Sequence, residues 1–187
     1  MRIALTGSSS VGKTFLSNHL MKNKKFRSYI SHFITPDARS ILDKMGHGHT
    51  DVMSRDSLRE FQIAYFKRKQ QIEHNQYNFL TERSFIDVEA FWRVRDTFDM
   101  PPSMQNKLTE KCYYHAQKYD LHIYLPFGIV PFQSDGYRSE DIEFHYKVDH
   151  KIQDLLQTWK LRYITLDRLE IEHRVNKVIN QLSSLKG

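Results

Sequence analysis

The sequence has little cysteine, and it lacks apolar runs of membrane-spanning length, repeats and low-complexity stretches. The single cysteine, Cys112, cannot form an internal disulfide, which favours a reducing compartment. Met1 leads directly into a short apolar segment, so we expect no signal peptide. These absences predict a protein that is cytoplasmic and has no membrane partner.

The composition fits one compact domain. The chain has 187 residues, of which 40% are hydrophobic, enough for a substantial core over residues 1–187. The formal net charge of +6 suggests an anionic partner, either nucleotide phosphates or nucleic acid. Charge alone does not choose between them, and composition leaves the oligomeric state open.

A complete phosphate-binding loop signature, G-x-x-x-x-G-K-[ST], lies near the start of the chain. The motif and the residue after it are Gly7, Ser8, Ser9, Ser10, Val11, Gly12, Lys13, Thr14 and Phe15. In such loops backbone N–H groups point at phosphate oxygens, and the following helix adds its positive dipole end. Lys13 would reach the β- and γ-phosphates, and Thr14 would offer its hydroxyl to Mg²⁺. The sequence therefore predicts that residues 7–15 bind ATP and Mg²⁺.

Strand and helix patterns alternate along the rest of the chain. Strands are predicted at 2–6, 29–34, 78–81, 122–125 and 162–166. Helices are predicted at 13–23, 39–44, 87–96, 103–118 with Ser103 as its cap, 148–159 and 171–182, together with a long charged helix that contains Leu58 to Ile72. This alternation is typical of an α/β fold with a five-stranded parallel sheet and helices on both faces.

Ligands bind such sheets at the carboxyl ends of the strands, where polar residues follow each predicted strand. Asp37 is placed to take or orient the proton of a phosphate acceptor, or to cap the next helix. Glu82 suits either the metal shell or the base role, and the sequence does not assign the two roles between these carboxylates. Arg39 follows the same strand as Asp37 and is a candidate substrate contact.

Two arginines are candidates for phosphate clamps, because guanidinium groups match phosphate oxygens and keep their charge. They are Arg83, directly after Glu82, and Arg138, in the segment Asp135-Gly136-Tyr137-Arg138. A salt bridge to a nearby carboxylate is the structural alternative for each. Asp87 has two interpretations as well, since it can contact the acceptor or favour the start of a helix.

Several other side chains near the predicted cleft are ambiguous. The aromatic ones can stack on a planar base or belong to the core, and the basic ones can hold an acceptor phosphate or a polynucleotide backbone. The aromatic residues are Phe85, Phe91, Trp92 and Tyr137, and the basic ones are Arg93 and Arg95.

The motifs together resemble those of small P-loop kinases of the nucleoside and nucleotide kinase group, and within it the AAA-28 type domain found in nicotinamide riboside kinases. The resemblance rests on the phosphate loop, Ala38-Arg39, Thr81-Glu82-Arg83-Ser84-Phe85-Ile86-Asp87 and Asp135-Gly136-Tyr137-Arg138, and spans nearly the whole chain. It implies that Lys13, Arg83 and Arg138 bind phosphates and that Thr14 and Glu82 serve magnesium. It also implies a small lid at about residues 127–141 and an acceptor hydroxyl activated by Asp37 or Glu82. Pro36 stands where related chains often have glutamate, which leaves the base unassigned.

Three functions agree with these features. The first is a kinase that phosphorylates a free nucleoside, nucleotide or similar metabolite. The second is a kinase that acts on nucleotides within DNA or RNA, such as hydroxymethylpyrimidines. The third is an ATPase or switch without a phosphate acceptor, against which the lid motif and the missing N-K-x-D pattern both argue.

Overall fold

The computed structural model describes residues 1–95, 101–134, 136–137 and 139–186. The strands are β1 (Arg2–Thr6), β2 (His32–Ile34), β3 (Phe79–Glu82), β4 (Leu121–Tyr124) and β5 (Tyr163–Thr165). The helices are α1 (Lys13–Lys22), α2 (Lys24–Arg27), α3 (Ala38–Lys44), α4 (Arg55–Glu73), α5 (Phe85–Val94), α6 (Pro102–Ala116), α7 (Ile142–Thr158) and α8 (Ile171–Lys186), with a 3₁₀ helix at Thr50–Val52. The predicted alternation of strands and helices is confirmed.

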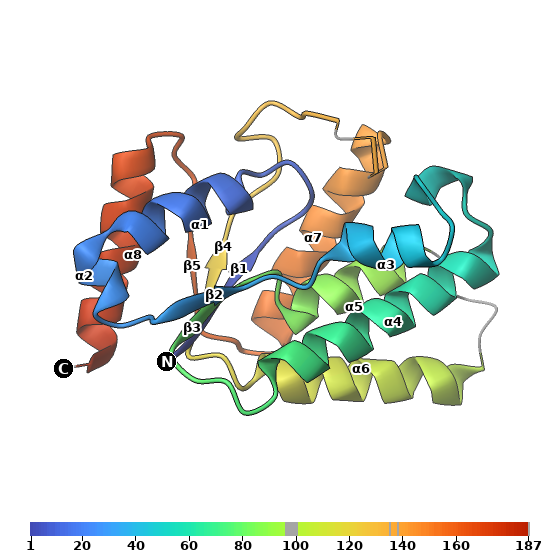
Figure 1. Ribbon diagram of the computed structural model, residues 1–187, viewed down its shortest axis with the longest axis horizontal. Coiled ribbons are helices and arrows are strands. Elements are labelled where there is room, and N and C mark those ends of the chain that lie inside the picture. The colour runs from blue at the N-terminus through green and yellow to red at the C-terminus, as the bar shows by residue number, and fades with distance from the viewer. Residues whose placement is uncertain (96–100, 135, 138, 187) are drawn as a thin grey trace.

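In the described part of the chain the strands form one parallel sheet with the order β2-β3-β1-β4-β5 (Figure 1). On the central strand β1, Ala4 pairs with Thr81 of β3 and with His122 of β4. The chain places β2 and β3 on one side of β1 and β4 and β5 on the other. The carboxyl end of β1 is therefore the position at which sheets of this kind bind ligands.

Helices cover both faces of the sheet (Figure 1). Successive side chains of β1 point to opposite faces, and each face has its own core. Ile3 and Leu5 pack with α1 and α8 in one core, whereas Ala4 belongs to the other, which α4, α5, α6 and α7 complete. The predicted five-stranded sheet with helices on both faces is confirmed.

Several element boundaries differ from the prediction, most of all the start of α7, which begins at Ile142 rather than residue 148. β2 begins at His32 rather than residue 29, because the Ile30 N–H bonds the Phe26 carbonyl in the turn that ends α2. Helix α6 begins at Pro102 with Pro101 as its N-cap, so the predicted cap at Ser103 is wrong. Helix α5 begins at Phe85, two residues before the predicted start.

The predicted lid lies between β4 and α7. Its described residues form no helix or strand, and they make hydrogen bonds to two other parts of the molecule. The Ser10 hydroxyl donates to the Gln133 carbonyl (2.6 Å), and the Thr50 N–H donates to the Tyr137 carbonyl (3.2 Å). The segment thus spans from the phosphate loop to the connection between α3 and α4.

None of the helices in the described ranges combines the length and the apolar character that a membrane crossing requires.

Candidate active site

The phosphate loop connects β1 to α1, and its backbone requires glycine at two positions. Gly7 has φ +146°, and a Cβ there would lie 2.4 Å from the Leu125 carbonyl oxygen. Gly12 has φ +84°, and Ser10 also takes a positive φ, of 57°. Val11 instead packs into the core formed with α1 and α8. The shape of the loop therefore depends on backbone conformations that glycine adopts without steric strain.

The side chain of Lys13 points into this loop. It is buried, and its Nζ donates hydrogen bonds to the carbonyl oxygens of Gly7 and Ser8. The ammonium group thus lies where a loop of this shape receives phosphate oxygens. Phe15 contributes its backbone to the first turn of α1, while its ring is exposed and lies 4.4 Å from the ring of His19.

Thr14 and Glu82 meet at the end of the sheet. Glu82 is the last residue of β3, paired in register with Leu5 of β1, and its Oε2 accepts a hydrogen bond of 3.0 Å from Thr14 Oγ1. A hydroxyl and a carboxylate are the oxygen donors that Mg²⁺ prefers, and Mg²⁺ is usually held by one or two such groups together with phosphates and water. The two side chains therefore fit a shared Mg²⁺ site.

Arg83 lies between the phosphate loop and α5. Its backbone is in the left-handed region with φ 64°. The guanidinium Nη2 donates to Ser9 Oγ (3.3 Å), Nη1 lies 3.7 Å from Asp87 Oδ1, and Cζ lies 4.7 Å from the Phe91 ring centroid. The predicted phosphate clamp is thus next to the loop and also has its salt-bridge partner.

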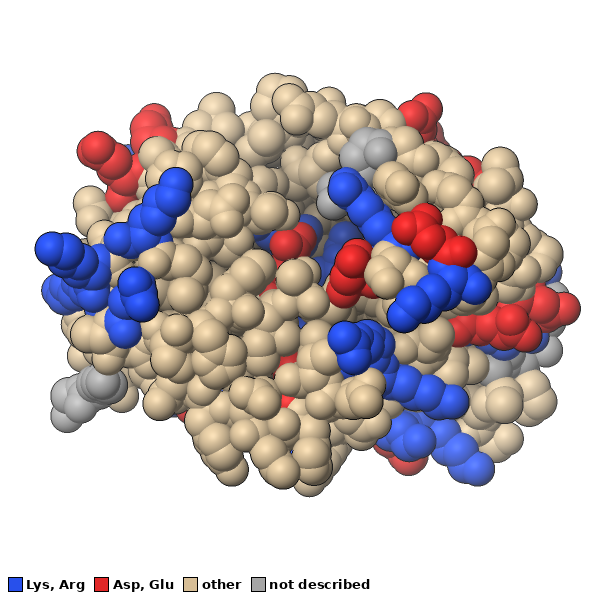
Figure 2. All heavy atoms as spheres, in the orientation of Figure 1, with Lys and Arg blue, Asp and Glu red and all other residues tan. Residues whose placement is uncertain are grey.

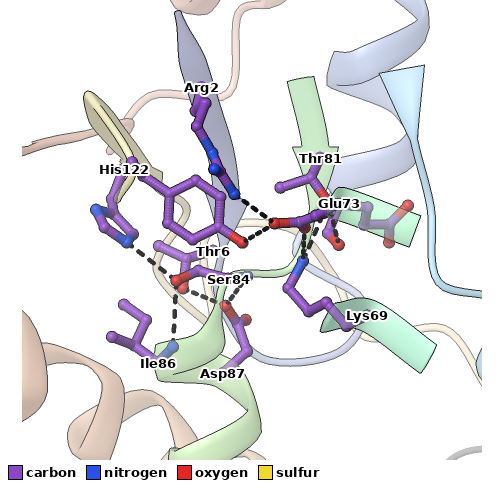
Figure 3. Close-up of polar contacts among 11 residues, drawn as sticks. Arg2, Thr6, Lys69, Glu73, Thr81, Ser84, Ile86, Asp87 and His122 are labelled. Carbon is purple, nitrogen blue, oxygen red and sulfur yellow. Dashed lines mark hydrogen bonds and ion pairs between the residues drawn. The ribbon is translucent and has the colours of Figure 1, made fainter. Parts of the chain in front are cut away.

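Asp87 is fully buried and joins the phosphate loop to the start of α5 (Figure 3). Its carboxylate accepts hydrogen bonds from Thr6 Oγ1 (2.7 Å), Gly7 N (3.0 Å) and Ser84 N (2.7 Å). With the Ser84 side chain it forms a capping box at the first turn of the helix. These contacts favour the structural interpretation of Asp87 over direct contact with an acceptor.

A buried polar network lies beneath the loop (Figure 3). Lys69 Nζ donates to Glu73 Oε1 (2.5 Å) and to Thr81 Oγ1 (3.1 Å), while the Tyr119 hydroxyl donates to Glu73 Oε2 (2.7 Å). Arg2 adds an ion pair with Glu73 at 3.6 Å. Burial lowers the pKa of Lys69 and raises that of Tyr119. The network holds α4 against β1 and β3. It thereby stabilises the two strands that lead to the phosphate loop and to Glu82.

His122 completes this support from β4. It is fully buried, and burial lowers its pKa to about 3, so the imidazole is neutral. Its Nε2 lies 3.0 Å from the Ser84 hydroxyl, which itself accepts from the Ile86 N–H. The hydrogen bond between this neutral histidine and Ser84 orients the cap of α5.

A cavity of about 350 Å³ opens beside the phosphate loop. In Figure 2 the face of the molecule is hollowed near its middle, with acidic and basic side chains on the floor of the hollow. Ser9, Thr14, Glu82 and Arg83 line the side next to the loop. The cavity is also lined by Phe61, Gln62, Tyr65, Phe91, Arg95 and Phe144.

Asp37 and Arg39, at the start of α3, also line the cavity. Asp37 is the N-cap of this helix and accepts a hydrogen bond from Ser40 N (3.2 Å), so it has the capping role considered for it while facing the site. The Arg39 guanidinium lies 5.1 Å from the ring centroid of Tyr137. The predicted lid residues Asp135 and Arg138 lie outside the described residues.

The ambiguous aromatic and basic residues separate into two groups. Phe91, Tyr137 and Arg95 line the cavity. Phe85 and Trp92 are buried away from it, and Arg93 is bound to Glu89 (2.7 Å) and Thr109 (2.7 Å).

The sequence analysis did not find Gln62 and His145. Gln62 on α4 is 3% exposed, and within the described ranges its side-chain amide has no hydrogen-bond partner. His145 on α7 has Nδ1 3.0 Å from the Ser8 hydroxyl and Nε2 2.7 Å from the Ser139 carbonyl oxygen, so it joins the phosphate loop to the lid. The available signal for Gln62 was its position among Phe61, Tyr65 and Phe66, which share the buried face of α4.

Solved structures of three enzymes share this fold over nearly the whole chain. A deoxyadenosine kinase from M. mycoides, with the products dCMP and dCDP bound, is 17% identical with a TM-score of 0.67, and the match covers 99% of this chain and 100% of that one. A thymidylate kinase from Candida albicans is 17% identical with a TM-score of 0.70, covering 99% and 92%. The NadR protein in complex with NR is 16% identical with a TM-score of 0.65, covering 98% of this chain and 51% of that one.

No curated protein matches the sequence. The family AAA_28, described as an AAA domain, matches residues 2–174, which include the phosphate loop, Glu82, Arg83, the lid and all five strands. This chain belongs to the AAA_28 family of AAA domains.

Proposed function

We propose that this protein is an ATP-dependent kinase that transfers the γ-phosphoryl group to a free nucleoside or nucleotide. One observation carries the proposal: Ser9 and Thr14 of the phosphate loop line the same cavity as Phe61 and Phe91. A triphosphate bound by the loop would direct its terminal phosphate toward whatever fills this cavity. Phosphoryl transfer depends mainly on such positioning of donor and acceptor.

The donor side of the site supports binding of ATP with Mg²⁺. Lys13 would contact the β- and γ-phosphates, since its ammonium already lies inside the loop. Thr14 and Glu82 would hold Mg²⁺, which neutralises phosphate charge when it is bound. Arg83, next to Ser9, would stabilise charge on the transferred phosphoryl group, and Arg138 would do so from the lid.

The acceptor side suits a planar heterocycle. Phe61 and Phe91 supply aromatic surface, and the buried amide of Gln62 supplies one donor group and one acceptor group. A base that stacks on the rings and bonds this amide would satisfy a side chain that has no partner among the described residues. The similar structures include a deoxyadenosine kinase, a thymidylate kinase and NadR in complex with NR, which agrees with this class of acceptor.

The acceptor proton, where the acceptor is a hydroxyl, would go to Asp37 or Glu82, since both line the cavity. We place the enzyme in the cytoplasm, where ATP and free nucleotides are supplied.

The test is a transfer assay with γ-labelled ATP. The acceptors are nucleosides, nucleoside monophosphates, nicotinamide riboside and DNA that contains hydroxymethylpyrimidines. We expect label in one of the free nucleosides or nucleotides. Label only in DNA, or release of labelled phosphate without any labelled acceptor, would contradict the proposal.

The Lys13→Ala variant is the control for this assay. It should abolish transfer and leave the far-UV circular dichroism spectrum unchanged. Transfer that survives the substitution would exclude the phosphate loop as the active centre.

A further inference from the structure

The guanidinium group of Arg95, at the C-cap of α5, forms no ion pair with a described residue, and Asp51 is the described carboxylate whose charge acts on it. Its Nη1 is buried without a hydrogen-bond partner, and no described carboxylate forms an ion pair with it. Three rings surround it, with Cζ at 5.8 Å, 5.4 Å and 5.6 Å from the centroids of Phe61, Phe91 and Phe144. Burial, and secondarily the charge of Arg83, lowers the pKa of Arg95 to about 10, against the opposing charge of Asp51. The side chain therefore stays charged at neutral pH, while its Nη1 has no hydrogen-bond partner among the described residues.

Arg83 lies against one of the same rings, although it also forms an ion pair with Asp87 at 3.7 Å. Both guanidinium carbons lie within 5.4 Å of the Phe91 ring centroid, and Arg83 Nη1 is also buried without a hydrogen-bond partner. Two cations that face one aromatic ring repel each other, because the dielectric constant inside a cavity is low. An anionic group bound by both residues would offset this repulsion and accept hydrogen bonds from both guanidinium groups.

The carboxylates that line the cavity already accept hydrogen bonds from the protein. Asp37 accepts from Ser40 N, and Glu82 accepts from Thr14 Oγ1. Asp87 is held by three donors. An acceptor hydroxyl needs a base to take its proton, whereas an oxygen of a phosphate dianion has no proton to lose. The arrangement thus suits a phosphate as the attacking group.

We propose that Arg95 and Arg83 together bind the phosphate of the acceptor, so that the acceptor is a nucleoside monophosphate; this rests on the kinase function proposed above. An oxygen of that phosphate attacks the γ-phosphorus of ATP. The new bond joins this oxygen to phosphorus, while the bond from the γ-phosphorus to the β,γ-bridging oxygen breaks. The products are ADP and a nucleoside diphosphate, and no proton is transferred.

The first experiment uses the wild-type protein alone. The kcat/KM for each nucleoside monophosphate is compared with that for the corresponding nucleoside in the γ-labelled ATP assay. We expect the monophosphate to be preferred by at least about 10-fold, as a lost charge-assisted hydrogen bond implies. A nucleoside that is phosphorylated as efficiently as its monophosphate would overturn the inference but leave the kinase function intact. Absence of transfer to every acceptor would refute the kinase function itself.

The second experiment compares Arg95→Met with Arg68→Met. Arg68 is exposed on α4 outside the cavity and bonds only Gln71 among the described residues, so its substitution makes the same change of charge. Arg95→Met should lower kcat/KM for the monophosphate by about 10- to 100-fold and leave the KM for ATP unchanged. Arg68→Met should change neither value. Arg95→Met could instead change which base is preferred while the ratio of kcat/KM for the monophosphate to kcat/KM for the nucleoside stays the same. That result would show that Arg95 binds the heterocycle and would overturn the inference.

Discussion

Replacing Asp87 by asparagine distinguishes a structural carboxylate from one that binds substrate. The side chain is fully buried, and its two oxygens accept from Thr6 Oγ1, Gly7 N and Ser84 N. Asparagine keeps the size but replaces one acceptor oxygen by an NH₂ group, which faces a donor in either orientation. It also removes the negative charge that strengthens the remaining bonds.

The expected cost follows from these contacts. A hydrogen bond to a charged group contributes about 1.5–3 kcal/mol, and a buried donor left without a partner costs about 1–3 kcal/mol. Asp87→Asn should therefore reduce the free energy of unfolding by about 2–4 kcal/mol. For a chain of this length each kcal/mol lowers the melting temperature by about 2–4 °C, so a decrease of about 5–15 °C is expected.

Thermal unfolding followed by circular dichroism measures this change, and Asp56→Asn is the matched control. Asp56 has an 83% exposed side chain that pairs only with Arg59 among the described residues, so its substitution should cost less than about 0.5 kcal/mol. If Asp87→Asn melts within 1 °C of the wild type and instead raises the KM of the acceptor, the structural interpretation of Asp87 is refuted.

Three further predictions concern the loop, the buried histidine and the lid. Gly7→Ala should abolish ATP binding, measured by calorimetry, because its Cβ would lie 2.4 Å from the Leu125 carbonyl oxygen; wild-type affinity would show that the loop can move aside. His122 has a folded pKa of about 3, well below the usual value of about 6.5, so the unfolded chain binds more protons at acid pH. Its contribution to stability should be complete above about pH 6.5 and decline as the pH falls toward 3; urea titrations from pH 7.5 to 4.5 test this, and a His122→Asn variant with the same pH dependence as the wild type would contradict it. Arg138→Ala should lower kcat more than the affinity for ATP, as expected of a group that acts on the transition state, whereas a loss of binding at constant kcat would make it a docking residue.

The sequence carried the information for the sheet and for the donor side of the site, because both depend on local patterns. The phosphate loop is contiguous, and Glu82 follows a short apolar strand directly, so its place at the sheet edge near Thr14 could be predicted. The predicted ends of helices and strands were less accurate where a turn residue sets the end, as Pro101 does before α6.

The acceptor side depends on packing between helices, which a sequence does not display. Gln62 looks like an ordinary polar residue of a helical segment, and Arg95 was one of two ambiguous basic residues. Only the approach of α4, α5 and α7 encloses them. For Asp87 the signal was present, since Ser84 and Asp87 have the spacing of a capping box, but the same spacing also agreed with a residue facing the cleft.

His145 connects the phosphate loop to the segment that precedes α7. The Ser139 carbonyl can only accept a hydrogen bond, so Nε2 carries a proton and, in the neutral ring, Nδ1 accepts from the Ser8 hydroxyl. A ligand that moves Ser139 would therefore also act on the phosphate loop. For a nucleotide on the loop and an acceptor in the cavity, as proposed above, this coupling would be reciprocal, so that each changes the affinity for the other by the same factor.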